Sequence, residues 1–522
     1  MRTSDQTGFG VRLAEVIAAL SLATDLGMGQ PMDHALRRCL LAVRLGEALG
    51  LDERALRDVY YVGLVCSVGC TIKLQEFTHW FQDEISAAGK SATLDPRESL
   101  PAAMFLLRHV GYGEPPLRRA RKVMSALAFG EQEYHRSSIT CHETCMSFGE
   151  MLGFDPSIRS ALGQMHERWD GRGVPRGLRG EEMALAARIA HMAGDIEVFH
   201  RLGGVEAAIA MVRRRASKSY DPKIAQRFRQ QASQLLAEVE TEAIWETVLA
   251  AEPAPHQWIT ERQLDSVARA MAHFVDVKSL YTVNHSTGVA ELSEAAARGL
   301  GLSDIEVAAV RRAGLLHDLG RIGVPVGIWD KRGPLTEAEW ERVRMHPYLT
   351  ERVLARSAAL GKLGALGALH HERLDGSGYH RGVAAPSIPT AARILAASDF
   401  FHTKIEPRPH RPALTLEAAS EEATREAQAG RLDREAVNAV LGAAGQRQLP
   451  RRRMLPAGLS DRELEVLRLV ARGRSIHDMA KILYISPKTV GHHIQHIYGK
   501  IGVSSRVAAT LFAMRHGLLN EV

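Results

Sequence analysis

The sequence predicts an all-helical protein built from several domains. Its 522 residues are enough for roughly three to four domains of ordinary size. Segments such as HALRRCLLAVRLGEALG and TERVLARSAALGKLG repeat apolar residues at helical spacing, whereas the alternation that marks strands is rare. Alanine, leucine, arginine and glutamate dominate these segments, and all four are good helix formers. We therefore expect few strands or none.

The composition narrows the class of protein. With 45% apolar and 24% charged residues, the chain can form ordinary cores, which excludes disorder of the whole chain. Five cysteines are too few for a disulfide scaffold. There is no run of 18 apolar residues and no signal-peptide pattern at the start, so we expect a cytoplasmic protein without a membrane span. The net charge of +6 permits nucleic-acid binding without establishing it.

An internal repeat predicts two copies of one helical domain. MHERWDGRGVPRG begins at Met165, and HHERLDGSGYHRG begins 205 positions later at His370. Upstream, a second set of matches has an offset of 251, with His34 facing His285 and Gly69 facing Gly320. Two matched blocks in the same order indicate a duplicated domain. We place the copies at 12–249 and 260–445, joined by AAEPAPHQW.

The second copy carries a pattern typical of a metal centre. It contains LLHDLGRIGVP, MHP, HHERLDGSGY and ARILAASD, and His285 precedes them on a predicted helix. Imidazoles combined with carboxylates suit first-row divalent metals. Two such metals about 3.5–4 Å apart can clamp an in-line displacement at phosphorus. His317 could then bind one metal while Asp318 bridges both. The alternative is that several of these histidines are core or surface residues.

At these motifs the second copy resembles the HD-GYP family of HD phosphohydrolases over about 180 residues. The resemblance implies an all-helical fold, two or three divalent metals (iron or manganese) and hydrolysis of cyclic di-GMP. Tyr281 stands where trinuclear members carry an additional glutamate, which favours two metals. Asp318 and Arg321 are the expected catalytic residues. The metal ligands implied are His285, His317, Asp318, His346, His370, His371 and Asp399. The expected ligand-binding residues are Arg321, Lys331, Asp375, Gly376, Gly378 and Tyr379.

Some family positions differ in this chain. The family's lysine after the HD pair is Arg321, and the proline of the GYP motif is His380. We therefore expect hydrolysis of a phosphodiester, with a cyclic dinucleotide as the substrate and cyclic di-GMP as the leading candidate. The alternative is a non-catalytic body that binds a ligand or dimerises.

The first copy lacks most of the predicted metal ligands. Cys66 and Ser67 replace the His-Asp pair, Met165 replaces His370, and Gly194 replaces Asp399. We expect a pseudoenzyme with a binding or dimerisation role. A separate zinc site is conceivable from two thiols and two imidazoles. Its candidates are His34, Cys66, Cys145 and His166. Buried cysteines acting as small apolar residues, or redox-sensing thiols, are the alternatives.

The last 64 residues predict a DNA-binding domain. Ser460 and Glu463 form a capping-box pattern, and Ser486-Pro487 starts a later helix at helix-turn-helix spacing. LSDRELEVL, SPKTV and KIGVSSR resemble the LuxR-type domain, which implies four helices and a dimer on double-stranded DNA. The alternative is a helical bundle without DNA affinity. The residues expected to face DNA are Lys488, Thr489, His492, His493 and Lys500.

The resulting hypothesis is a transcription regulator with two HD-GYP-like helical domains, a basic linker at 446–458 and a LuxR-type domain at 459–522. Gly491 stands where lysine is usual in the family and removes a phosphate contact. Whether the body hydrolyses its ligand, only binds it, or only dimerises is open at this point.

Overall fold

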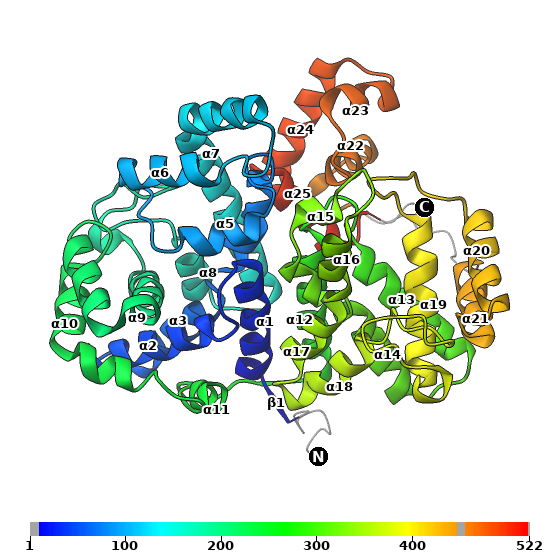
Figure 1. Cartoon of the computed structure of the whole chain (residues 1–522), viewed down its shortest axis with the longest axis horizontal. Helices are drawn as coiled ribbons and strands as arrows, with labels where there is room; N and C mark the ends of the chain where they lie inside the picture. The colour runs from blue at the N-terminus through cyan, green and yellow to red at the C-terminus, as the bar shows by residue number, and fades with distance from the viewer. Residues whose placement is uncertain (1–9, 446–454, 520–522) are drawn as a thin grey trace. The chain divides into compact units, whose positions relative to one another are not determined.

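The computed structural model describes residues 10–445 and 455–519, and the chain divides into two compact units between Gln263 and Leu264 (Figure 1). The described residues are mainly helical and contain almost no strand, which confirms the predicted fold class. The two strands among them are short: β1 (Val11–Arg12) pairs antiparallel with β2 (Trp258–Ile259). Since β1 and β2 lie at the two ends of the first unit, their pairing ties its termini together.

The first unit runs from dark blue to green in Figure 1. Its helices are α1 (Leu13–Gly27), α2 (His34–Ala48), α3 (Glu53–Val65), α4 (Val68–Lys73), α5 (Glu84–Ser91), α6 (Ser99–His109), α7 (Pro116–Met151), α8 (Pro156–Leu162), α9 (Leu185–Arg215), α10 (Pro222–Ala237) and α11 (Ile244–Ala250). Two 3-10 turns, η1 (Leu74–Phe77) and η2 (Gly180–Glu182), complete it.

The second unit contains the second helical body and the C-terminal helices. The helices of the body are α12 (Glu261–Asp276), α13 (His285–Gly299), α14 (Asp304–Leu316), α15 (Val326–Trp329), α16 (Glu337–Arg344), α17 (His346–Leu354), α18 (Ala358–Gly367), α19 (Thr390–Ile405), α20 (Leu416–Gln428) and α21 (Arg434–Gly445). Its 3-10 turns are η3 (Leu319–Gly323) and η4 (Ala385–Ser387). The C-terminal elements are η5 (Pro456–Gly458), α22 (Asp461–Ala471), α23 (Ile476–Leu483), α24 (Pro487–Ile501) and α25 (Arg506–Arg515).

The first body, which is the first unit, and the second body, α12 to α21, each contain a close crossing of two helices at a glycine. A methyl group on Gly63 of α3 would lie 3.0 Å from the Cα atom of Cys39 in α2. A methyl group on Gly314 of α14 would lie 2.8 Å from the Cα atom of Ala290 in α13. Because both pairs have the offset of 251 found in the sequence, glycine permits the same approach of backbones in both bodies.

Two buried carboxylates also recur at matching positions. Asp25 accepts the backbone N–H of Ala35 at 2.9 Å, and Asp276 accepts that of Ser286 at 2.8 Å. Both bonds satisfy a donor near the start of a helix, where the backbone has no intrahelical partner. The recurrence supports the predicted repeat by geometry that is independent of the HER motif.

In the C-terminal domain, η5 to α25, the helix caps predicted from the sequence are present. The Ser460 hydroxyl accepts the Glu463 N–H, and the Glu463 carboxylate accepts the Ser460 N–H at 2.8 Å. Ser486 caps α24, with Pro487 in its first turn. Val466, Val490 and Ile497 lie in the buried core of the four helices. Residues 446–454, most of the predicted basic linker, lie outside the described part of the chain.

One stretch, Glu53–Phe77, is long and apolar enough to cross a membrane by length and composition. The structure divides it into α3, α4 and η1, and 72% of its most apolar window is buried inside the protein. Burial of this kind is what a core segment of a globular body shows.

Candidate metal centre

In the second body, most of the predicted metal ligands lie at helix ends, and their side chains come close together. His285 and His346 are the first residues of α13 and α17, and His317 directly follows α14. His370 and His371 follow α18, and Asp399 lies within α19. Ligands at helix ends can converge without interrupting the helices that hold them. Three groups of ligand atoms each fall within 4.8 Å of one another: His285, His317 and Asp399; His317, Asp318 and His370; His346, His370 and His371.

Asp318 stands between two pairs of histidines. Its Oδ2 atom lies 3.7 Å from Nε2 of His285 and 3.6 Å from Nε2 of His317. Its Oδ1 atom lies 3.4 Å from Nε2 of His346 and 3.7 Å from Nε2 of His370. The two oxygens of one carboxylate therefore face two different ligand groups, as a bridging ligand of two metals must.

Three of the histidines are oriented by backbone carbonyls. Nδ1 of His317 contacts the Gly314 carbonyl at 2.8 Å, and Nδ1 of His346 contacts that of Val343 at 2.6 Å. Nδ1 of His370 contacts the Gly367 carbonyl at 2.7 Å. A carbonyl only accepts, so Nδ1 carries a proton in all three rings, and Nε2 is the nitrogen that faces the centre.

The electrostatics of the centre favour a cation. Burial lowers the pKa of His346 to about 4 and that of His370 to about 3, so both imidazoles are neutral ligands at neutral pH. Burial alone would raise the pKa of Asp318, but Arg321 and the surrounding histidines hold it well below its usual value. A buried carboxylate that stays ionised needs positive charge beside it.

Two buried atoms at the centre fit a metal. Nε2 of His317 and Oδ1 of Asp318 are buried and have no hydrogen-bond partner among the described residues. Buried polar atoms are nearly always paired, so such atoms require an explanation. Coordination to a divalent ion would satisfy both, and the imidazole and carboxylate donors suit iron or manganese.

A cavity of about 630 Å³ opens beside the centre. Asp318, His346, His371 and Asp399 line it. Its cationic side chains are Arg321, Lys331, Arg332, Lys404, Arg408 and Arg411. Arg321 donates to Asp318 at 3.0 Å and stacks on the Trp329 ring at 3.8 Å, which fixes its guanidinium beside the predicted metals.

Half of the predicted ligand-binding residues do not line this cavity. Arg321, Lys331 and Tyr379 line it, whereas Asp375, Gly376 and Gly378 do not. Asp375 accepts a hydrogen bond from the Ser377 hydroxyl at 2.6 Å, and Gly376 has a positive φ of 79°. A methyl group on Gly378 would meet the Glu372 Cα at 2.5 Å. These three residues shape the turn, and their contact with ligand stays a prediction.

A buried glutamate closes that turn in each body. Glu372 accepts the backbone N–H groups of Arg381 at 2.7 Å and Val383 at 3.0 Å. In the first body, Glu167 accepts those of Arg176 at 2.8 Å and Leu178 at 2.9 Å. The sequence offset is again 205. The shared HER motif therefore builds the loop in both bodies, independently of metal binding.

The first body fills the corresponding space with an arginine. Buried Arg38 donates to the hydroxyl of Ser67 at 2.9 Å, and Ser67 has the register position of Asp318. Gly194 has the register position of Asp399. A methyl group on Gly194 would lie 3.1 Å from the Cδ atom of Arg38. Arg38 also donates to the Gly63 carbonyl at 2.7 Å. A tethered cation thus occupies the space between the counterparts of two carboxylates.

The predicted grouping of His34, Cys66, Cys145 and His166 is wrong. Nδ1 of His34 pairs instead with Glu197, and burial raises the pKa of the Cys66 thiol beside Arg38. The ligand atoms that the structure brings within 4.8 Å of one another belong to Cys70, Cys141 and His166. The prediction failed because Cys141, not Cys145, has the offset of 205 from His346.

Two further residues contribute to the centres but are absent from the predicted sets. Glu406, at the end of α19, lies 2.9 Å from Nδ1 of His285 and orients that ring. Lys73 lies 2.7 Å from Nε2 of His166 in the first body. Helical spacing places Glu406 four residues from His402, but no motif in the sequence links it to His285. Only the fold shows both contacts.

In the C-terminal unit, α24 presents most of the predicted DNA-facing residues. Lys488, Thr489 and His492 are exposed, and His493 is half-buried. Lys500 is exposed but donates to Glu463 at 2.7 Å and to the Gly458 carbonyl at 3.0 Å. The structure therefore gives Lys500 a role in joining α24 to the start of α22.

Comparisons with known proteins identify both parts of the chain. A family model described as HD domain matches residues 134–224 and 265–436. A second model, for bacterial regulatory proteins of the luxR family, matches residues 457–513. The HD-domain match in both bodies agrees with the recurring glycine, aspartate and glutamate contacts described above.

The chain is 30% identical over 412 residues to the 3'3'-cGAMP-specific phosphodiesterase 3 of Vibrio cholerae, covering 78% of this chain and 89% of that protein. It is 36% identical over 191 residues to the cyclic di-GMP phosphodiesterase response regulator RpfG of Xanthomonas campestris, covering 36% of this chain and 50% of that protein. The crystal structure of the V. cholerae cyclic GMP-AMP specific phosphodiesterase V-cGAP3 aligns with a TM-score of 0.58 at 26% identity, covering 84% of this chain and 98% of that one. The chain therefore belongs to the HD-domain family, its relatives are HD-GYP cyclic-dinucleotide phosphodiesterases, and it carries a helix-turn-helix domain of the luxR family.

Proposed function

We propose that the second body hydrolyses a phosphodiester bond of a cyclic dinucleotide with the help of two divalent metals. The observation that carries the proposal is the position of Asp318, whose two oxygens face separate histidine pairs. His285, His317 and Asp399 would hold one metal, and His346, His370 and His371 the other. When bound, the ions would act as Lewis acids on a phosphoryl oxygen.

The residues around the centre can bind and orient the substrate. Arg321 presents a planar guanidinium fixed by Asp318 and Trp329, a geometry that suits a phosphate. Lys331 and Arg408 line the same cavity and can neutralise a second phosphate. The volume of about 630 Å³ is within the usual range of small-molecule sites, about 300–1,000 Å³.

The relatives suggest which cyclic dinucleotide to test first. Cyclic di-GMP is the candidate from the sequence motifs, and relatives named as cyclic di-GMP phosphodiesterases match part of the chain. The relative that matches 412 residues is named as specific for 3'3'-cGAMP. We therefore place 3'3'-cGAMP first and cyclic di-GMP second.

Hydrolysis assays test this proposal. The full-length protein, loaded anaerobically with iron or manganese, is incubated with 3'3'-cGAMP, cyclic di-GMP and cyclic di-AMP, and linear products are measured by chromatography. We expect cleavage of 3'3'-cGAMP that chelation abolishes and that Asp399→Asn reduces. No cleavage of any of the three by the metal-loaded protein would contradict the proposal.

A second function, ligand sensing without turnover, is favoured by one contact. Arg321 occupies a hydrogen-bonding position on Oδ2 of Asp318, the same atom that faces His285 and His317. An arginine held there competes with a metal for that oxygen. Calorimetric binding of 3'3'-cGAMP without product formation would favour sensing over hydrolysis.

The C-terminal domain is proposed to bind double-stranded DNA with α24 in the major groove, as helix-turn-helix domains do. Exposed Lys488 at its start suits a phosphate, and His492 one turn later can reach base edges. Lys488→Ala should weaken binding to all sequences and reduce the salt slope by about one. His492→Ala should instead change sequence preference. Equal effects of both changes on every sequence would contradict these roles.

A homodimer is proposed because two recognition helices on a pseudo-palindrome need two chains. The first unit offers an apolar surface for self-association. Leu100, Leu117 and Met124, on α6 and α7, are 72%, 75% and 71% exposed, and no residue of α6 is buried. Light scattering should show a dimer that Leu117→Glu with Met124→Glu converts to a monomer. A dimer that persists in this variant would place the interface elsewhere.

Control of DNA binding by ligand is the expected output of this cytoplasmic regulator. A ligand shifts a conformational equilibrium only if it binds one state better than the other. Adding 3'3'-cGAMP should change the DNA affinity of the full-length chain. Unchanged DNA affinity with ligand bound would contradict a sensory role for the helical bodies.

A further inference from the structure

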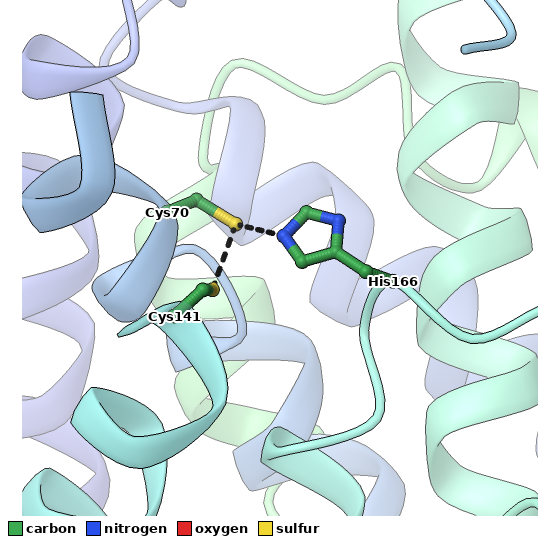
Figure 2. Close-up of side chains that lie close together, drawn as sticks. All are labelled: Cys70, Cys141 and His166. Atoms are coloured by element: carbon green, nitrogen blue, oxygen red, sulfur yellow. Dashed lines mark hydrogen bonds between the residues drawn. The ribbon is translucent and has the colours of Figure 1, made fainter. Parts of the chain in front are cut away.

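Three side chains of the first body come from distant parts of the sequence, and their ligand atoms lie within 4.8 Å of one another (Figure 2). Sγ of Cys70, on α4, is 3.5 Å from Sγ of Cys141 on α7. It is also 3.4 Å from Nε2 of His166, in the turn after α8. Figure 2 shows Cys70 at the corner of this group, with the imidazole and the second thiol both directed at its sulfur.

Two members of the group stand where the second body has ligands. Cys141 and His166 have the offset of 205 from His346 and His371. Cys70 has the offset of 251 from Arg321. The position of one predicted metal in the second body is thus rebuilt in the first with softer donors, while Arg38 fills the position of the other.

The donor set and its spacing point to one metal. Zinc binds thiolates at about 2.3 Å and imidazoles at about 2.0–2.1 Å in tetrahedral geometry, which puts neighbouring donors about 3.6–3.8 Å apart. The distances of 3.5 and 3.4 Å are close to these values. We propose that Cys70, Cys141 and His166 bind one Zn²⁺ ion in the first body.

The hydrogen bonds of His166 leave the lone pair on Nε2, the nitrogen that faces Cys70. The Lys73 ammonium, which can only donate, lies 2.7 Å from Nε2, so Nε2 carries a lone pair and no proton. The Tyr134 hydroxyl lies 3.4 Å from Nδ1 and can accept its proton, which orients the ring. The Lys73 ammonium already places a positive charge at Nε2 of His166. The metal would displace this ammonium from Nε2.

Binding of a divalent ion changes the charge of the two thiols. Zinc deprotonates its thiol ligands, so binding releases two protons to solvent and leaves a neutral unit of one ion and two thiolates.

Three protein ligands leave one position of a tetrahedral zinc ion open. Its ligands join α4, α7 and the turn after α8, and none of the three is a carboxylate that could share a second metal. Cys70 is 9% exposed and His166 is half-buried, which leaves an entry path for the ion. The inference does not depend on catalysis by the second body.

Cobalt substitution tests the site in the full-length protein. The chain is stripped with chelator and titrated anaerobically with Co²⁺, and the sulfur-to-cobalt charge-transfer band is recorded. All five cysteines lie in the first copy, so this band cannot come from the second body. We expect one cobalt ion per chain to give the band, and added Zn²⁺ to abolish it.

Matched variants locate the ligands. The band should be lost in Cys70→Ala and in Cys141→Ala. It should persist in Cys39→Ala, a buried thiol that contacts the Tyr60 carbonyl instead, and in Asp318→Ala. Circular dichroism checks that each variant is folded. If the two cysteine variants unfold, the wild-type and Asp318→Ala spectra decide. No band in the wild-type protein, or a band that survives in both folded cysteine variants, would overturn the proposal.

Discussion

In the second body Asp318 stands between two groups of histidines, whereas in the first body the guanidinium of Arg38 takes the corresponding space. The surrounding backbone is built by the same contacts in both: a glycine at a helix crossing, an aspartate at a helix start and a glutamate in the HER loop. The difference teaches that these scaffold contacts are separable from the metal ligands. A tethered cation can occupy the space between these positions while the scaffold contacts are kept.

The largest difference in hydrolysis is expected between variants at the position of Asp318 in the second body and at its counterpart in the first body. Asp318→Ala removes the one side chain that faces both ligand groups, so hydrolysis should fall by more than about 100-fold, beyond the effect of outer-shell changes. Ser67→Ala, at the matching position of the first body, should leave turnover unchanged. Both are measured as product formed and as iron or manganese bound per chain. Full metal content in the Asp318 variant would contradict its bridging role.

A smaller effect is expected from the carboxylate behind the first histidine of each body. Glu406 orients His285, and Glu197 contacts His34. Loss of a carboxylate behind a ligating histidine costs about 10–100-fold in metal affinity or activity. Glu406→Gln should show this loss, and Glu197→Gln should show none. Equal turnover in the two variants would indicate that His285 needs no such partner.

The third prediction concerns pH and the buried aspartate of the first body. Burial raises the pKa of Asp25 from 3.8 to about 6, so the folded state holds its proton more tightly than the unfolded state. Stability should therefore fall as the pH rises from about 4 to about 6, by up to about 3 kcal/mol, and then level off. Asp25→Asn lacks this titration. Calorimetry should show its Tm rising relative to wild type over the same window, and a pH-independent difference would contradict the shift.

The smallest effect is a loss of stability in the HER loop, and it should be similar in the two bodies. Glu167→Gln and Glu372→Gln each disturb two buried hydrogen bonds to backbone N–H groups, at a cost of about 1–3 kcal/mol. Hydrogen-exchange mass spectrometry should show faster exchange in the HER loop of the altered body only. A loss confined to Glu372→Gln would mean that the first body no longer depends on this contact.

Much of this organisation follows from the sequence alone. Helical periodicity predicts the fold class because it reports which faces are buried, and the capping pattern at Ser460 and Glu463 is local and needs no tertiary information. The HD, HP and HHE motifs predict which residues of the second body gather at the candidate metal centre, because residue type at fixed spacing is a property of the chain.

The tertiary structure decided what spacing could not. Glu406 reaches His285 and Arg38 reaches Gly194 only because separate helices pack together. The cysteines show the limit most clearly: the offset of 205 from His346 singles out Cys141 over Cys145, but nothing in the sequence pairs Cys141 with Cys70. The rotation of α7 places Cys141, and not Cys145, beside Cys70 and His166, because a side chain's neighbours are set by the helix face that packs inward.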